Sequence, residues 1–307
     1  MVSLRKKQGG WFKRFIQTWK NHRRFQRFYT YVDSLPHGEQ PEERVIPYQS
    51  AVDEHEHPLY VSSIDYRCML IDMHTQDHKI KEFFTIFESG NYQQFVDIGA
   101  NYGEFVIGGV QCAPHILAIE ANPIVARCLK RSVQDYSHIE VIDQAVSSTN
   151  ATLQMRINPQ YSGGNRLVEE GNNTPDFFID QYAFILDVPC RKLSELLNHS
   201  LADSTSVAIK MDVEGHEAVL LGEIIEWFNP QVTSKLLIIF EFNNNSHHAF
   251  DHLLTQVEQL LALGCHLSTI CSRKEQFVSR QPIAQSEWKT AFEDSCEVIL
   301  EYCASEG

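Results

Sequence analysis

The chain has 307 residues and a formal net charge of −14 at pH 7, with 43% hydrophobic and 21% charged residues. This is the composition of a globular protein, and it excludes disordered and collagen-like chains. The longest strictly apolar run, Leu236–Phe240, is far shorter than the roughly 20 residues that a membrane-spanning helix needs. The acidic balance argues against nucleic acid as a partner, because phosphates are attracted by basic surfaces.

Residues 1–32 differ from the rest of the chain, since they hold nine Lys and Arg and no acidic residue. Apolar side chains at helical spacing predict an amphipathic helix here; they are Trp11, Phe12, Phe15, Ile16 and Trp19. Proline-rich residues 34–58 predict an irregular connector. We therefore expect an extension and connector over residues 1–60 and one larger domain over residues 61–307.

The apolar face of this predicted helix needs a partner, because such patches are rarely left in water. We expect it to pack against the larger domain or against a second copy in a homodimer. Peripheral contact with an anionic membrane surface is the alternative, because the flanking Lys and Arg suit it. The segment has no secretory signal pattern, and the eight cysteines form no Cys-x-x-Cys pair. We expect a cytoplasmic protein, with attachment at the inner membrane surface as the alternative.

From about residue 78 the chain alternates between predicted strands and helices. The predicted strands cover residues 94–99, 115–121, 139–146, 151–157, 207–213, 236–242, 266–271 and 296–302. The predicted helices cover residues 79–87, 103–112, 123–135, 192–197, 216–228 and 249–263. This alternation is typical of an α/β sandwich with a mostly parallel sheet, and such sheets bind ligands at the carboxyl ends of their strands. Residues 158–182 form a glycine- and acid-rich insertion, in which Tyr161–Arg166 is either a lid or a surface loop.

The first motif of chemical interest is Phe95–Gly103, an apolar strand that runs into an acid and two glycines. Gly99 would allow a tight turn, and Gly103 would allow a ligand to approach the start of the next helix. The spacing is not the Gly-x-Gly-x-x-Gly of dinucleotide-binding proteins. Asp97, at the strand end, suits the cationic part of an amino acid better than a pyrophosphate.

Two further strands end in acidic residues. Glu120 follows the second strand, 21 residues after Gly99, where a carboxylate can accept hydrogen bonds from both hydroxyls of a ribose. Asp143 follows the third strand, where it could accept from an adenine amino group or could be an ordinary turn residue.

The last motif is Ile209–Glu217, in which Lys210, Asp212 and Glu214 alternate with apolar residues. We expect these three side chains to project from one face of the strand. Ionisable groups in a buried strand are costly unless they reach a ligand at its open end. Asp212 or Glu214 could accept a proton, and Lys210 could orient a carboxylate. Asp212, Glu214, His216 and Glu241 could also surround a divalent metal, although the spacing does not indicate one, and we expect no metal.

The first, second and last motifs together resemble the FkbM-type methyltransferases over about residues 90–245. The resemblance implies a Rossmann-like class I fold, an α/β sandwich with a seven-stranded, mostly parallel sheet and an antiparallel last strand. It implies S-adenosylmethionine as the cofactor. The implied contacts with its methionine part are Asp97, Gly99 and Gly103, with Ala100 and Asn101 between them. Glu120 would hold the ribose, and Asp143 and Ala145 are further expected contacts.

The resemblance further implies that the segment Asp212–Gly215 faces the transferred methyl group, with Lys210, Asp212 and Glu214 as the expected catalytic residues. We expect O-methylation of a small-molecule or glycan hydroxyl. Methylation of nitrogen or carbon, and a cofactor-binding protein without catalysis, remain alternatives. A nicotinamide dehydrogenase is disfavoured by the missing glycine pattern.

Overall fold

The computed structural model describes residues 43–74, 77–168, 183–201, 204–242, 250–270, 272–273, 276–277, 281–282 and 296–304. The expected helix in residues 1–32 and residues 169–182 of the expected insertion lie outside these ranges. None of the helices in the described part is long and apolar enough to cross a bilayer.

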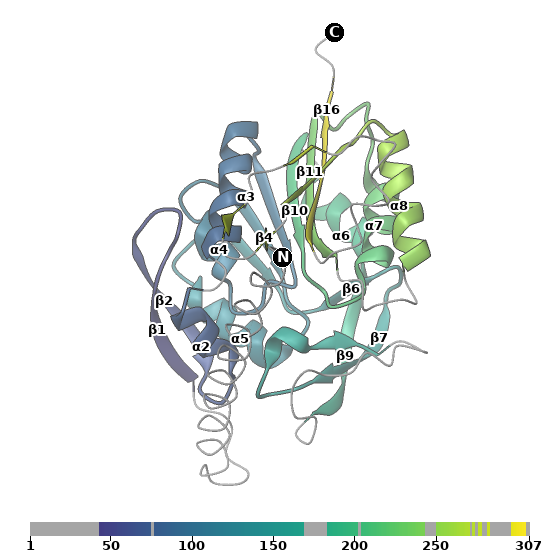
Figure 1. Ribbon diagram of the computed structural model, residues 1–307. Helices are drawn as coiled ribbons and strands as arrows, with labels where there is room; N and C mark the ends of the chain where they lie inside the picture. Colours follow the sequence, from purple (N-terminus) through teal and green to yellow (C-terminus); the bar gives the residue numbers. More distant parts are fainter. Residues whose placement is uncertain are drawn as a thin grey trace, which may run out of the picture. The chain divides into compact units, whose positions relative to one another are not determined.

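The central element is a mixed sheet with the strand order β15-β12-β16-β11-β10-β3-β4-β5 (Figure 1). Its strands are β3 (Gln94–Ile98), β4 (His115–Ile119), β5 (Ile139–Ile142), β10 (Ser206–Met211), β11 (Lys235–Phe242), β12 (His266–Ile270), β15 (Gln281–Pro282) and β16 (Cys296–Cys303). The five strands from β5 to β11 are parallel, and β16 runs antiparallel between β11 and β12. The expected seven-stranded sheet with its antiparallel last strand is therefore confirmed, and two-residue β15 extends its edge.

Helices cover both faces of this sheet (Figure 1). One layer contains α3 (Asp77–Gly90), α4 (Glu104–Gly109) and α5 (Pro123–Ser132), and the other contains α6 (Leu193–Ser200), α7 (Glu217–Trp227) and α8 (Phe250–Ala262). Successive residues of β10 enter opposite cores: Val207 and Ile209 pack with α6, α7 and α8, and Ala208 packs with the other layer. The strand is apolar on both faces from Val207 to Ile209 for this reason.

A second sheet lies beside the first and has the order β6-β9-β7-β8. It consists of β6 (Ala145–Ser147), β7 (Ala151–Ile157), β8 (Arg166–Leu167) and β9 (Phe184–Lys192). The prediction of one strand over residues 139–146 is wrong, because the chain leaves the first sheet after Ile142 and enters the second at Ala145. The apolar pattern does not predict β9, in which Asp187 and Pro189 interrupt the run of apolar residues.

The expected irregular connector over residues 34–58 is also wrong from residue 43 onward. Strands β1 (Glu43–Gln49) and β2 (Glu56–Ser62) pair as an antiparallel hairpin, followed by the short helix α2 (Arg67–Asp72). Alternate hairpin residues, such as Tyr48 and Leu59, are fully buried in the core beneath α3, α4 and α5. Prolines are tolerated here because each strand of a two-stranded sheet has an open edge. The short strands β13 (Ser272–Arg273) and β14 (Gln276–Phe277) form another hairpin.

Candidate functional site

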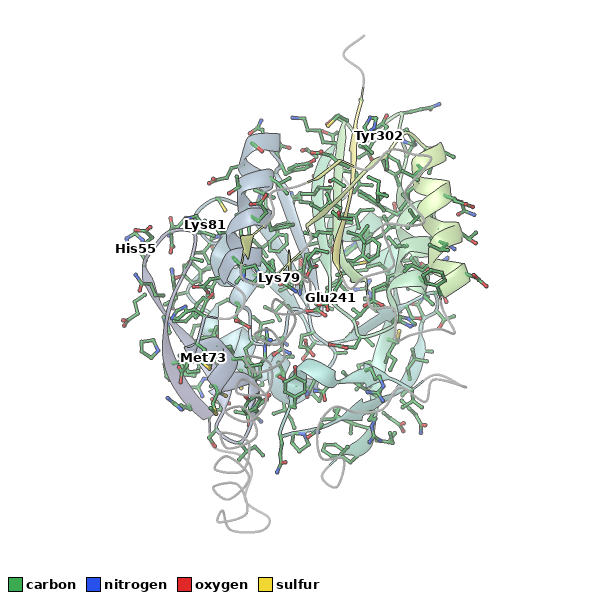
Figure 2. The ribbon with its side chains drawn as sticks, in the orientation of Figure 1. His55, Met73, Lys79, Lys81, Glu241 and Tyr302 are labelled. Atoms are coloured by element: carbon green, nitrogen blue, oxygen red, sulfur yellow. The ribbon has the colours of Figure 1, made fainter. Side chains whose placement is uncertain are left out.

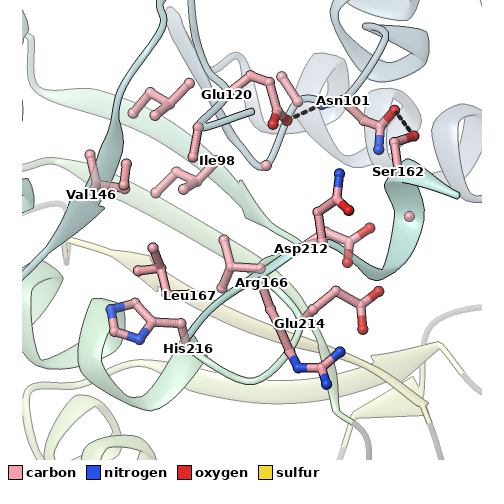
Figure 3. A pocket seen from close by; sticks show the side chains of 18 of the residues that line it. Ile98, Asn101, Glu120, Val146, Ser162, Arg166, Leu167, Asp212, Glu214 and His216 are labelled. Atoms are coloured by element: carbon pink, nitrogen blue, oxygen red, sulfur yellow. Dashed lines mark hydrogen bonds between the residues drawn. The ribbon is translucent and has the colours of Figure 1, made fainter. Parts of the chain in front are cut away.

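A cavity of about 250 Å³ opens at the carboxyl ends of β3, β4 and β10. One part of its wall is apolar and includes Ile98, Val146 and Leu167, and another part carries charged groups such as Asp212 and Glu214 (Figure 3). The 3-10 turn η1 (Ser162–Gly164) and β8 form its roof. The cavity therefore lies where ligands of open parallel sheets bind.

Gly99 connects the three strand ends that form the floor. It has a φ of +77°, and a Cβ atom at this position would lie 2.0 Å from the backbone oxygen of Asp212. The N–H groups of Gly99 and Ala100 both donate to the carbonyl of Ile119 on β4, at 2.9 and 3.0 Å. Only glycine combines this backbone conformation with such a close approach.

The structure gives Gly103 a different role from the expected ligand approach. Gly103 does not line the cavity. Its φ is +97°, and a Cβ atom would lie 2.5 Å from Cδ1 of Leu129 on α5. The absence of a side chain allows α4 to begin close to α5, so this glycine shapes the protein core.

Glu120 is buried at the end of β4 and faces the cavity (Figure 3). Its carboxylate accepts hydrogen bonds from the backbone N–H groups of Asn101 and Asn122, at 2.9 and 2.8 Å. Burial raises the pKa of Glu120 to about 7, although these two N–H groups and Lys210 act in the opposite direction. Glu120 is thus a fixed hydrogen-bond acceptor whose charge changes near neutral pH.

Lys210 and Asp97 form a buried ion pair between β10 and β3. The two residues are in register in the sheet, and Lys210 Nζ lies 3.0 Å from Asp97 Oδ1 and donates to the carbonyl of Gly99. Burial by itself would lower the pKa of Lys210, but Asp97 and Asp212 raise it above its usual value. Lys210 therefore carries an ammonium group at the cavity wall, and Asp97, which is 0% exposed, does not line the cavity.

Asp212 and Glu214 lie in the turn between β10 and α7. The prediction that Lys210, Asp212 and Glu214 share one face of a strand is wrong, because β10 ends at Met211. Glu214 has a φ of +52°, a strained backbone conformation that is frequent at functional sites. Its side chain is exposed at the cavity mouth, yet partial burial and the neighbouring Asp212 and Glu217 carboxylates raise its pKa well above the usual value.

The possible metal cluster does not form. The described residues contain no group of three or more His, Cys, Asp and Glu side chains arranged to hold a metal ion. His216 Nε2 instead lies 2.9 Å from Ser147 Oγ. Glu241 lies 3.4 Å from the ammonium group of Lys79 on α3 (Figure 2).

The polar group after the third strand is Gln144, whereas Asp143 points elsewhere. Asp143 pairs with Lys130 at 2.8 Å on the surface and does not line the cavity. Gln144 and Ala145 do line it, and Gln144 Oε1 is buried without a hydrogen-bond partner in the described part of the chain. Sequence spacing could not separate these two neighbours, because the direction of each side chain depends on the turn between β5 and β6.

The glycine-rich segment 161–166, expected to be either a lid or a surface loop, lines the cavity. Its backbone is tied to Asp65, whose carboxylate accepts from Ser162 N–H at 3.2 Å and from the Tyr102 hydroxyl at 2.7 Å. Ser162 Oγ also lies 3.1 Å from Asn101 Oδ1 (Figure 3). These contacts fix the roof to the turn that follows β3.

The structure brings eight of the eleven expected site residues to the cavity wall. They are Gly99, Ala100, Asn101, Glu120, Ala145, Lys210, Asp212 and Glu214. Asp97, Gly103 and Asp143 are not part of the wall. Arg67, Glu104 and Gln144 also line the cavity, although they are not among the expected site residues. Arg67 precedes every motif in the chain.

The cavity fits S-adenosylmethionine, the cofactor that the resemblance implies. The apolar wall would pack against the adenine, and the unpartnered Gln144 Oε1 could accept from its amino group. Glu120 would present a carboxylate to the ribose hydroxyls. When bound, the cofactor supplies a methyl group activated by a sulfonium, and Asp212 and Glu214 lie on the charged part of the wall.

Comparisons with solved structures find similar chains at low identity. The O-methyltransferase from Bacillus cereus in complex with SAH is 8% identical with a TM-score of 0.41, covering 73% of this chain and 80% of that chain. TYW2 from M. jannaschii in complex with AdoMet is 10% identical with a TM-score of 0.41, covering 87% and 88%. Precorrin-6y C5,15-methyltransferase from Geobacter metallireducens is 12% identical with a TM-score of 0.34, covering 71% and 87%.

No curated protein matches the chain. The model of the methyltransferase FkbM domain matches residues 97–265, which is more than half of the chain and includes the turn after β3, Glu120 and the turn after β10. The chain therefore belongs to the FkbM family of methyltransferases, which use S-adenosylmethionine.

Proposed function

We propose that this methyltransferase transfers the methyl group to a hydroxyl of a small molecule or glycan. The observation that supports this most is the position of Glu214 on the cavity wall, with a raised pKa and Asp212 beside it. A hydroxyl must lose its proton as its oxygen gains the methyl group. A carboxylate with a raised pKa is a stronger base than an ordinary carboxylate and accepts such a proton more efficiently.

Lys210 does not serve as the base in this proposal, because its amine is already protonated and held by Asp97. Its ammonium lies 4.0 Å from Asp212 Oδ2. We infer that Lys210 orients the carboxylate of Asp212. Asp212 would then position the acceptor hydroxyl, and Glu214 would take its proton.

The charged part of the wall suits an acceptor with several polar groups. A guanidinium and a carboxylate lie close together there, since Arg166 lowers the pKa of Glu214. Tyr161 also lines the cavity, and burial raises its pKa to about 12, so its hydroxyl is a donor at neutral pH. Neighbouring donors and acceptors suit the hydroxyl groups of a sugar or another polyol.

The proposal is tested by incubating the enzyme with S-adenosylmethionine labelled in its methyl group and a panel of sugars, glycosides and simple polyols. We expect label on an oxygen of at least one acceptor. Glu214→Gln should lower kcat by about 100-fold or more, because it removes the proton acceptor. Glu226→Gln, which changes an exposed carboxylate of α7 paired with Lys192, is the matched control and should retain full activity.

Label found only on nitrogen or carbon of the accepted compounds would contradict O-methylation. An undiminished kcat in Glu214→Gln would contradict the role of Glu214. Activity lost only in Asp212→Asn would assign proton acceptance to Asp212 instead.

A further inference from the structure

A buried ion pair on the charged part of the wall is not used by the proposed reaction. Arg67 Nη2, from α2, lies 2.5 Å from Glu104 Oε2 at the start of α4. The Arg67 side chain is 14% exposed and that of Glu104 is 4% exposed, and both line the cavity. Burial would lower the pKa of Arg67, but Glu104 raises it above its usual value, so the guanidinium is charged.

This pair has unused hydrogen-bonding capacity on both members. Glu104 Oε1 and Arg67 Nε are buried without a hydrogen-bond partner among the residues that the structure describes. An unpaired buried donor or acceptor destabilises the ligand-free protein. A ligand that offers an ammonium to Glu104 and a carboxylate to Arg67 would satisfy both charged groups at once.

The position of the pair along the cavity indicates which ligand group would reach it. Figure 3 shows Val146 on one side of Glu120 and Asn101, whose N–H donates to Glu120, on the other. Glu104 follows Asn101 by three residues at the start of α4 and also lines the cavity. The order of the wall is thus apolar, then a ribose acceptor, then an ion pair. S-adenosylmethionine has the same order of chemistry, namely adenine, ribose and a zwitterionic amino acid.

We propose that Arg67 and Glu104 bind the amino-acid end of the cofactor, with Arg67 contacting the α-carboxylate and Glu104 the α-ammonium. Asp97 also lies near Glu104, but it is paired with Lys210 and does not line the cavity. The proposal rests on the identity of the cofactor and is independent of the acceptor.

Arg67 is held ready for this role before any ligand binds. Its backbone N–H donates to Asp65 Oδ1 at 2.9 Å. The same carboxylate accepts from Tyr102 and from Ser162, so Arg67 is fixed to both the turn after β3 and the roof. Arg67 also lies outside residues 97–265 that match the family model. The segment between the β1–β2 hairpin and α3 therefore completes the cofactor site.

The test is calorimetric titration of the full chain with three ligands that differ in this end. S-adenosylhomocysteine carries the whole zwitterion, decarboxylated S-adenosylmethionine keeps only the ammonium, and 5′-methylthioadenosine has neither group. We expect Arg67→Gln to lower the affinity for S-adenosylhomocysteine by about 10- to 100-fold, since a hydrogen bond to a charged group is lost. Glu104→Gln should lower the affinities for S-adenosylhomocysteine and for decarboxylated S-adenosylmethionine to a similar extent. Binding of 5′-methylthioadenosine should change by less than about twofold in both variants.

Arg44→Gln is the matched control, because Arg44 pairs with Asp72 on the exposed side of the same hairpin region. It should leave all three affinities unchanged. Retained binding of 5′-methylthioadenosine shows that a variant is folded. If Arg67→Gln lowers the melting temperature markedly, the titrations are repeated with Arg67→Lys. This variant must lower the affinity for S-adenosylhomocysteine only.

Equal losses for all three ligands would overturn the proposal, and so would unchanged S-adenosylhomocysteine binding together with a raised KM for the acceptor. Failure of O-methylation would be distinguishable, because a protein that shows the expected ligand pattern but methylates no hydroxyl contradicts only the proposed function.

Discussion

Glu120 shows how the surroundings of one residue set its chemistry. Two backbone N–H groups orient its carboxylate, and burial raises its pKa to about 7. Ribose hydroxyls donate hydrogen bonds, so they favour the ionised carboxylate. Cofactor binding must therefore lower the pKa of Glu120 and release a proton when it occurs below about pH 7.

The cofactor affinity should consequently fall as the pH is lowered through about 7. Between about pH 8 and about pH 6 we expect the dissociation constant of S-adenosylhomocysteine to rise about tenfold, since the free protein then holds a proton that the complex must lose. Lys210 and Asp97 lie near Glu120 but are paired with each other. Calorimetry at several pH values checks this.

Glu120→Gln is the control for that titration, because it cannot ionise. It should bind more weakly at pH 8 and should show little dependence on pH. Glu217, whose burial also raises its pKa to about 7, would account for any slope that remains in this variant. An unchanged slope in Glu120→Gln would contradict the assignment.

Gly99 allows a second test at the level of a single residue. Gly99→Ala should lower the free energy of unfolding by about 2–4 kcal/mol, because alanine is strained at positive φ and its Cβ would overlap the backbone of Asp212. Gly264→Ala separates the two effects: its φ is +98°, but its Cβ would only touch the Tyr302 ring at 3.4 Å. Denaturant unfolding should show a clearly smaller loss of unfolding free energy in Gly264→Ala than in Gly99→Ala. Equal losses in the two variants would refute the clash at Gly99.

Sequence reasoning located the site residues that end strands. Glu120 and Asp212 could be predicted because the carboxyl ends of parallel strands meet at one edge of the sheet. Asp97 and Asp143 also end strands, but they pair with Lys210 and Lys130 and do not line the cavity. Such pairing depends on neighbours in space, which spacing along the chain does not reveal. Arg67 reaches the cavity through tertiary contacts alone, so no local pattern could indicate it.

At the level of elements, the helices and the parallel strands were predictable and the irregular parts were not. The alternation of apolar runs indicated β3, β4, β10 and β11, because strands covered on both faces are apolar throughout. The β1–β2 hairpin was missed because its prolines are typical of connectors. The division between β5 and β6 was missed because the apolar run continues across it while the chain changes sheets.

Asp65 joins three elements, and this leads to a prediction at the same scale. It links the segment after β2, the turn after β3 and the roof at Ser162. Asp65→Asn should lower the free energy of unfolding by about 2–4 kcal/mol, because buried donors lose part of their acceptor. Hydrogen exchange of residues 158–165 should become faster in this variant.

Asp72→Asn is the matched control for Asp65, since Asp72 is an exposed partner of Arg44. Surface pairs of this kind contribute little, so both the stability and the exchange rates should stay near those of the unmodified protein. Unchanged exchange at the roof in Asp65→Asn would show that the roof is held by other contacts.

At the scale of the whole molecule, basic and acidic residues are unevenly distributed along the chain. Residues 1–32 carry nine basic and no acidic residues, and the remainder carries 17 basic and 40 acidic residues. Opposite charges within one chain attract each other at high effective concentration. This favours packing of the basic segment against the acidic domain or against a second copy over binding to a membrane.

Deletion of residues 1–32 should therefore lower the melting temperature or change the oligomeric size, as measured by thermal unfolding and light scattering. The full-length protein should not float with anionic vesicles. Flotation that disappears on deletion would instead establish membrane contact through this segment.

The central claim is that the cavity at the ends of β3, β4 and β10 holds S-adenosylmethionine through Glu120. Calorimetric titration of the full chain at about pH 8 tests it most directly. We expect micromolar binding of S-adenosylmethionine and of S-adenosylhomocysteine, and a loss of about 10- to 100-fold in Glu120→Ala, because the ribose loses a charged acceptor. Absence of heat with both ligands, or tight binding of NAD in their place, would contradict the claim.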